Sequence, residues 1–234
     1  MTTELPRSPM DRAFLTNIEG VTEVVLVRHG QQRFPTDIRS ATPDDWRDPP
    51  LTETGQQQAA AVGRHLANEP VHAVFSSQLA RAHDTGAAVA AAHDVEHHVV
   101  TELEEIHMFR DLPPDQTAMD AVGPLLLAGY RERFARVRRW DVYPHTEPSL
   151  DFRRRVNGAI EGIIDGHAGE TVVIACHGGV INAYLTEILG LEQDMFFRPA
   201  HASVHRVLAK EDRRVILNLN EVAHLLSPED LLTF

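Results

Sequence analysis

The sequence predicts an α/β fold, a three-layer sandwich with a mainly parallel central sheet, one antiparallel edge strand and an inserted helical cap. Two observations carry this prediction. Apolar, β-branched runs alternate with segments of helical periodicity, an order typical of helices packed on both faces of a parallel sheet. The runs at 21–27 and 171–175 are almost continuously apolar, as expected for strands that are buried on both faces.

The first half of the chain contains two predicted strand–helix units. The strand at 21–27 is followed by a loop with four prolines. Thr52 can cap the next helix, whose apolar residues form one stripe. A second strand at 71–75 precedes helical spacing from 79 to 89, and a weak strand lies near 97–100.

The second half repeats this order and ends differently. A helix is predicted at 152–163, a strand at 171–175 and a further helix at 181–188. Two last strands lie near 203–208 and 214–219. The short link between them suits a hairpin, so one edge of the sheet is predicted to be antiparallel.

We expect one domain that spans residues 21–234, a length within the range of a single large domain. Residues 1–20 are polar with scattered prolines and charges, so we predict a loosely ordered lead-in there. Residues 107–148 combine several prolines with a helical stretch at 130–137. We interpret them as a helical cap inserted into the domain.

The composition limits the classes of function. The formal net charge of −12 argues against general nucleic-acid binding, because phosphate neutralisation needs a basic surface. The single cysteine, Cys176, cannot form an intramolecular disulfide. No apolar run approaches the roughly 20 residues of a membrane helix, and the N-terminal residues lack the order of a signal peptide. We therefore expect a cytoplasmic protein that binds neither nucleic acid nor membrane.

Unusual polar residues follow three of the predicted strands. Arg28, His29 and Gly30 come after the first strand, Arg81 lies early in the helix after the second, and His177 follows the strand at 171–175. Ligands of open α/β sheets bind beyond the carboxyl ends of the strands. Each residue alone has an ordinary structural explanation, but together they predict two histidines and two arginines converging at one edge.

Five segments in order resemble the motifs of the histidine phosphatase superfamily, which has the phosphoglycerate mutase-like fold. They are Arg-His-Gly at 28–30, Leu-Thr-x-x-Gly-x-x-Gln-Ala at 51–59, Ser-Ser-x-Leu-x-Arg-Ala-x-x-Thr at 76–85, Leu-x-Glu-Ile at 103–106 and His-Gly-Gly at 177–179. An isolated Arg-His-Gly would be weak, but five ordered matches across residues 21–185 are a specific signal.

The resemblance implies a role for each matching residue. His29 is the nucleophile that takes the phosphoryl group, and Glu105 gives a proton to the leaving oxygen. Arg28, Arg81 and His177 hold the phosphate oxygens. These residue types suit the chemistry, since neutral imidazole is a good nucleophile and the guanidinium fork pairs with two phosphate oxygens at once.

Further candidates lie close to these residues. Gly178 belongs to the predicted phosphate-binding turn, and Gln31 or Gln32 is a candidate amide donor to the phosphate. Glu104 is the alternative to Glu105 as proton donor, and we prefer Glu105 because it precedes Ile106 in the Leu-x-Glu-Ile spacing. The resemblance implies no metal ion and no cofactor, because guanidinium and imidazolium groups supply the positive charge.

A cysteine-based phosphatase mechanism does not fit the sequence. That chemistry needs an arginine six positions after the cysteine, where Cys176 is followed by Asn182. We therefore predict that Cys176 is a small buried residue. We expect a structural role for His201, with an approach to the phosphate site from its rim as the alternative.

Two enzyme functions and one non-enzymatic function remain open. The glycine-containing run that follows the acid in many relatives is replaced here at 106–110, which favours a phosphomonoester hydrolase over a phosphoglycerate mutase-type phosphoryl transfer. A non-catalytic phosphate-binding domain is the third possibility. The expected partner is a small phosphorylated metabolite, whose identity the sequence does not tell. Relatives are often dimers, but no apolar stripe here indicates an interface, so a homodimer stays open.

Overall fold

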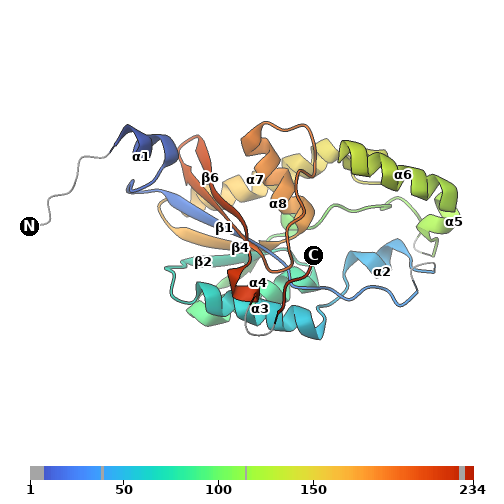
Figure 1. Ribbon diagram of the computed structural model, residues 1–234, viewed down its shortest axis with the longest axis horizontal. Coiled ribbons are helices and arrows are strands. Elements are labelled where there is room, and N and C mark those ends of the chain that lie inside the picture. Colours follow the sequence, from blue (N-terminus) through green and yellow to red (C-terminus); the bar gives the residue numbers. More distant parts are fainter. Residues whose placement is uncertain (1–7, 38–39, 114, 227–229) are drawn as a thin grey trace, which may run out of the picture.

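The computed structural model describes residues 8–37, 40–113, 115–226 and 230–234, and these contain a six-stranded sheet (Figure 1). All neighbouring strands pair in parallel except β5, which is antiparallel to both of its neighbours. The mainly parallel sheet with an antiparallel edge is therefore confirmed, and the reversed strand lies one place in from that edge. The order across the sheet is β3 (His97–Val99), β2 (Ala73–Ser76), β4 (Thr171–Cys176), β1 (Thr22–Arg28), β5 (Val204–Lys210) and β6 (Arg213–Glu221).

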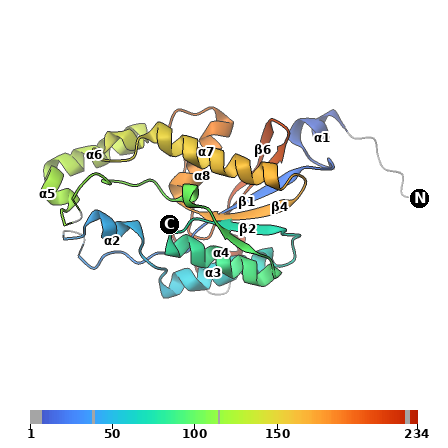
Figure 2. The same cartoon turned by 180° about the vertical axis from the view of Figure 1, so that it is seen from behind.

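Helices cover both faces of the sheet, as predicted for a three-layer sandwich. Helices α3 (Glu53–Leu66) and α4 (Ala80–His93) lie on one face, and α7 (Ser149–Gly166) and α8 (Gly178–Leu189) lie on the other (Figures 1 and 2). The predicted N-cap residue of α3 is confirmed, because the side-chain hydroxyl of Thr52 accepts a hydrogen bond from the backbone N–H of Gly55 at 3.0 Å.

Strand β1 shows why its sequence is almost continuously apolar. Successive side chains of a strand point to opposite faces. Val24 and Leu26 pack in the core beneath α7 and α8, whereas Val25 and Val27 pack in the core beneath α3 and α4. All four side chains are fully buried, so no position on either face is left for a polar residue.

The segment that we interpret as a cap is helical and extends beyond the sheet (Figure 1). It contains α5 (Ala118–Val122), α6 (Pro124–Val137) and the short 3₁₀ helix η2 (Trp140–Val142). Helix α6 is longer than the predicted stretch at 130–137, because Pro124 occupies the first helical turn, where a missing N–H costs nothing. Asp194 holds the end of this segment, since its Oδ2 accepts hydrogen bonds from the Trp140 backbone N–H and the Ser149 hydroxyl.

Several short elements were not predicted. Helix α1 (Pro9–Phe14) lies in the lead-in, and Ser8 and Asp11 form a capping box at its start. The lead-in is therefore more ordered in its described part than the sequence indicated. Helix α2 (Pro43–Arg47) lies in the proline-containing loop, and η1 (Thr101–Leu103) and η3 (Ala223–Leu225) are single 3₁₀ turns. Within the described residues, no helix is both long and apolar enough to span a bilayer.

Candidate active site

The register of β1 and β4 brings His29 and His177 together, although 148 residues separate them. Arg28 pairs with Cys176 as the last partners of the two parallel strands. The backbone N–H of His29 donates to the Cys176 carbonyl at 2.9 Å, and the two imidazole ring centroids lie 5.1 Å apart. The predicted convergence at the carboxyl ends of the strands is therefore confirmed for this pair.

Arg81 reaches the same place from α4. Ser77 lies in the turn between β2 and α4, and its backbone N–H donates to the Ala175 carbonyl on β4, which fixes the start of the helix beside the site. The guanidinium of Arg81 is almost fully buried, and its Nε donates to Nε2 of His29 at 3.2 Å. A second donor of Arg81 is held by the Arg47 carbonyl at 2.8 Å.

The hydrogen bonds of His29 define its tautomer. Nδ1 lies 2.7 Å from the carbonyl oxygen of Gly30, which can only accept, so Nδ1 carries the proton. Nε2 then carries a lone pair, which accepts the hydrogen bond from Nε–H of Arg81. Gly30 also needs its small size, because a Cβ there would lie 2.4 Å from the Gly55 carbonyl oxygen.

Burial and neighbouring cations keep both histidines neutral. Desolvation, followed by the charge of the Arg81 guanidinium, lowers the pKa of His29 well below its usual value. Desolvation and the charges of Arg81, Arg28 and Arg155 lower the pKa of His177 in the same direction. A neutral imidazole with its lone pair at Nε2 is therefore the form of His29 at neutral pH.

Arg28 is oriented by residues from the far end of the chain. Its guanidinium donates to the Pro199 carbonyl and, at 3.1 Å, to Nε2 of His201. Nδ1 of His201 must then carry the proton that Thr233 Oγ1 accepts at 2.9 Å. Desolvation is the main cause that lowers the pKa of Arg28 to about 10 and of His201 to about 3.

His201 has a structural role of the kind expected, because it orients Arg28, and it packs close to His29. Its ring centroid lies 5.8 Å from that of His29, and its side chain is buried. It therefore lies inside the cluster rather than at the rim. No motif marks this position, and the only sequence signal is its closeness to the strand at 203–208.

Glu104 and Glu105 have different surroundings. Glu105 accepts backbone N–H groups from Gly179 and Ile106 at 2.9 Å, and it lies at the N-terminal end of α8. Both carboxylate oxygens of Glu104 are engaged by side chains, Arg47 at 2.8 Å and Gln78 at 2.7 Å. Of the two carboxylates, Glu105 is the one bound to the strand-end turn that carries His177.

Several buried polar atoms have no partner among the described residues. Among them are both ring nitrogens of His177 and Nε of Arg28, which lie in this cluster. A Cβ at Gly178 would lie 3.7 Å from that Nε, so the Gly178 turn approaches it closely. Because an unpaired buried polar atom is unfavourable, these atoms indicate a place for a hydrogen-bonding ligand.

The two glutamines differ in placement. Oε1 of Gln31 accepts the Thr52 hydroxyl at 2.9 Å, which directs this side chain towards the start of α3. Gln32 lines the main cavity, whereas Gln31 and His177 are not among its described lining residues.

A cavity of about 830 Å³ opens at this cluster. One end holds Arg28, His29, Arg81, Glu105 and Gly178. Most of the remaining lining comes from α2, α6 and the segment 195–199, and the carbonyls of Arg47 and Pro199 in these segments also hold Arg81 and Arg28. The cluster therefore lies at the bottom of a cleft large enough for a substrate with a sizeable body.

The sequence matches one family model and several curated proteins. The family model of the histidine phosphatase superfamily (branch 1) matches residues 24–222. Phosphoserine phosphatase 1 of Hydrogenobacter thermophilus is 28% identical over 213 residues, covering 88% of this chain and 95% of that protein. A metal-independent phosphoserine phosphatase of Arabidopsis thaliana is 29% identical over 224 residues, covering 88% and 84%. A probable phosphoglycerate mutase, GpmB of Yersinia pestis, is 26% identical over 182 residues, covering 77% of each chain.

A solved structure shares the fold. The chain superposes on YhfR of Bacillus stearothermophilus with a TM-score of 0.73 and 24% identity, covering 87% of this chain and 99% of that one. This likeness supports the α/β architecture described above.

Proposed function

The chain belongs to the histidine phosphatase superfamily, and on that premise we propose that it hydrolyses phosphomonoesters through a phosphohistidine formed on His29. The phosphatase activity is supported over the mutase alternative by two phosphoserine phosphatases that match 88% of the chain. The observation that carries the catalytic assignment is the neutral His29 ring, whose Nε2 lone pair faces the Arg81 guanidinium.

In the first step, Nε2 of His29 attacks the phosphorus atom and the bond to the ester oxygen breaks. The charge of the transferred group is spread over its outer oxygens, so positioned cations provide most of the stabilisation. Arg28, Arg81 and the N–H-bearing nitrogen of His177 are the groups that would hold these oxygens. The unpaired Nε–H of Arg28 and the unpaired N–H of the His177 ring support this role, because phosphate oxygens would accept hydrogen bonds from both.

Glu105 is the proposed proton donor. It gives its proton to the leaving alkoxide in the first step and takes one from the attacking water in the second. The water breaks the bond between phosphorus and Nε2, which releases inorganic phosphate and restores neutral His29. Glu105 is favoured over Glu104 because Glu104 is held in an ion pair with Arg47.

The reaction as written does not need a metal ion. The guanidinium groups of Arg28 and Arg81 supply the positive charge. One relative is named as a metal-independent phosphoserine phosphatase. The proposed substrate is a small phosphorylated metabolite, and the phosphoserine phosphatases among the relatives support this broad class rather than phosphoserine itself.

The direct test is trapping of the covalent intermediate. Brief incubation of the protein with a ³²P-labelled phosphomonoester, followed by denaturation, should leave acid-labile label on the chain. His29→Ala should abolish both the label and the release of phosphate, while His98→Ala, which alters a half-buried ring on β3, should keep both. Normal turnover by His29→Ala would overturn the assignment.

A mutase and a binding domain give different results in the same assay. A mutase would convert 3-phosphoglycerate to its isomer, with little free phosphate, when bisphosphoglycerate is supplied. A binding domain would release no phosphate from any ester. Either result contradicts the proposed hydrolysis.

A further inference from the structure

The outer wall of the active-site cavity is unusually aromatic for this chain. The sequence has fourteen phenylalanine, tyrosine and tryptophan residues, and half of them line this one cavity. Three of the five methionines line it as well. The aromatic lining residues are Trp46, Phe109, Phe134, Trp140, Tyr143, Phe196 and Phe197.

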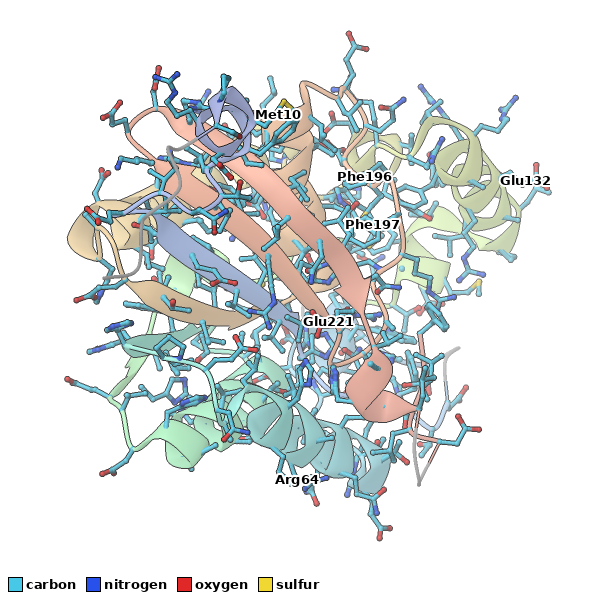
Figure 3. The ribbon with its side chains drawn as sticks, turned by 60° about the vertical axis from the view of Figure 1, so that its left-hand side comes forward. Met10, Arg64, Glu132, Phe196, Phe197 and Glu221 are labelled. Atoms are coloured by element: carbon cyan, nitrogen blue, oxygen red, sulfur yellow. The ribbon has the colours of Figure 1, made fainter. Side chains whose placement is uncertain are left out.

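These rings come from distant segments, and most of them pack in two groups. Phe134 of α6 lies 4.6 Å from Trp140 and 5.8 Å from Tyr143, measured between ring centroids. In the segment 195–199, the ring centroids of Phe196 and Phe197 lie 4.7 Å apart, and Figure 3 labels both residues. The cap is tied to that segment, because the Arg138 carbonyl accepts the backbone N–H groups of Asp194 and Met195. The rings of both groups line the same cavity, and backbone hydrogen bonds hold the two segments that carry them together.

The charges in the cavity have one predominant sign. Its described lining includes six arginines and two glutamates: Arg28, Arg47, Arg81, Arg131, Arg138 and Arg198, with Glu104 and Glu105. Glu104 is paired with Arg47, and Glu105 is held by backbone N–H groups. A cationic group of a ligand would therefore lie among arginines. In this described lining, both carboxylates are already engaged by other groups of the protein.

We propose that this phosphatase is selective for phosphomonoesters of bulky apolar or aromatic alcohols and disfavours phosphoserine. The inference rests on the proposed function and concerns the substrate class of the same site. The phosphate would occupy the end with Arg28 and Arg81, and the alcohol would fill the aromatic end. Burial of apolar surface against this wall then provides the affinity that distinguishes substrates.

Phosphoserine fits this cavity poorly in its size and in its ammonium group, whereas its carboxylate is shared with 3-phosphoglycerate and does not distinguish the two. Its side chain is a single methylene, so most of the aromatic wall would stay in contact with water. Its ammonium group would enter a region dominated by guanidinium groups, where like charges repel. 3-Phosphoglycerate has a similar size and no ammonium, so it separates the effect of charge from the effect of size.

The test compares three esters with alkyl leaving groups, so that leaving-group acidity does not decide the result. They are 2-(1-naphthyl)ethyl phosphate, 3-phosphoglycerate and phosphoserine. We expect kcat/KM to fall in that order, with the naphthyl ester at least about 100-fold above phosphoserine, the discrimination that a few methylene-sized contacts provide. Equal values for the naphthyl ester and phosphoserine, or a preference for phosphoserine, would overturn the proposal.

A variant pair on α6 locates the selectivity. Phe134→Ala should lower the ratio of kcat/KM for the naphthyl ester to that for 3-phosphoglycerate by about 10-fold, because it removes part of the apolar wall. Leu125→Ala is the matched control, since Leu125 lies on the same helix, is exposed and is not a lining residue. An unchanged ratio in Phe134→Ala would contradict the assigned wall.

Binding measurements separate this inference from the proposed chemistry. Calorimetric titration of His29→Ala with the naphthyl ester and with phosphoserine reads the cavity without turnover. Tighter binding of the naphthyl ester supports the inference even if the wild-type protein hydrolyses neither compound, in which case only the proposed hydrolysis fails. Tighter binding of phosphoserine overturns the inference, whatever the turnover.

Discussion

The carboxylate of Glu105 accepts the backbone N–H of Gly179 at 2.9 Å, which joins the turn after η1 to the first turn of α8. The contact leaves no room for a larger residue. A Cβ at Gly179 would lie 2.2 Å from Oε1 of Glu105 and 3.0 Å from its Cδ. Glycine at this position is therefore needed for the close approach of the proposed proton donor.

Gly179→Ala is expected to lower kcat by about 100-fold or more while the protein stays folded, because it displaces Glu105 and general acid catalysis contributes 10²–10⁴-fold. Steady-state kinetics and thermal unfolding measure the two effects. Gly162→Ala on α7 is the matched control, since its Cβ would meet open space. The control should keep its activity and gain roughly 0.5–1 kcal/mol of stability in the helix. Full activity in Gly179→Ala would contradict the role of this contact.

Glu105→Gln should show a loss of kcat/KM that depends on the leaving group. An alkyl phosphate needs the proton, so we expect a loss of about 10²–10⁴-fold. 4-Nitrophenolate leaves without a proton, so 4-nitrophenyl phosphate should lose much less. Glu104→Gln, which breaks the ion pair with Arg47, should change both esters by the same small factor. An equal loss for both esters in Glu105→Gln would show that it is not the proton donor.

The buried histidines predict an acid-sensitive fold. Desolvation is the first cause that lowers the pKa of His201 and of His205 to about 3, so the folded state binds their protons less readily than the unfolded state does. The contribution to stability is complete above the ordinary pKa of 6.5 and is lost as the pH falls from there towards 3. Within this window, each histidine should lower the free energy of unfolding by about 1.4 kcal/mol for every unit by which the pH falls.

Urea unfolding at pH 7.0 and pH 5.5 measures this loss. His201→Gln should reduce the difference between the two free energies by about 1.4 kcal/mol, because the glutamine does not titrate. His98→Gln, at a half-buried position on β3, is the control. A His201→Gln variant with the same pH dependence as the wild type would contradict the shift.

Asp194 is expected to position the cap. Its Oδ2 accepts hydrogen bonds from the Trp140 backbone N–H at 2.8 Å and from the Ser149 hydroxyl at 2.6 Å. The Asp194 side chain is buried. Asp194→Ala should lower the free energy of unfolding by about 1–3 kcal/mol, because it leaves two buried donors unpaired. It should also raise KM for a bulky aromatic ester with little change in kcat, since the wall that carries Trp140 moves.

The conservative variant separates this positioning role from a purely structural one. Asp194→Asn retains an acceptor oxygen, so its KM should lie close to the wild-type value. Stability and KM can be followed by urea unfolding and steady-state kinetics on the same preparations. A fall in kcat with an unchanged KM in Asp194→Ala would contradict the positioning of the wall.

Some features could be predicted from the sequence because they depend on local patterns. The buried strands at 21–27 and 171–175 follow from side-chain alternation, which requires apolar residues at every position of a strand covered on both faces. The convergence of His29 and His177 follows from the rule that parallel strands end at one edge. The ordered motifs predicted the family, which the family model confirms.

Other features depend on contacts between distant segments and have no local signal. The orientation of Arg28 by His201 and Thr233 joins residues separated by more than 170 positions. The aromatic wall is assembled from α2, the segment 109–143 and the segment 195–197, none of which shows a regular pattern that indicates its partner. The sequence alone thus determined the layers and the chemistry at the strand ends, because burial imposes a period on residues. Only the tertiary structure decided the shape and charge of the cavity, because loop and cap packing sets which side chains face each other.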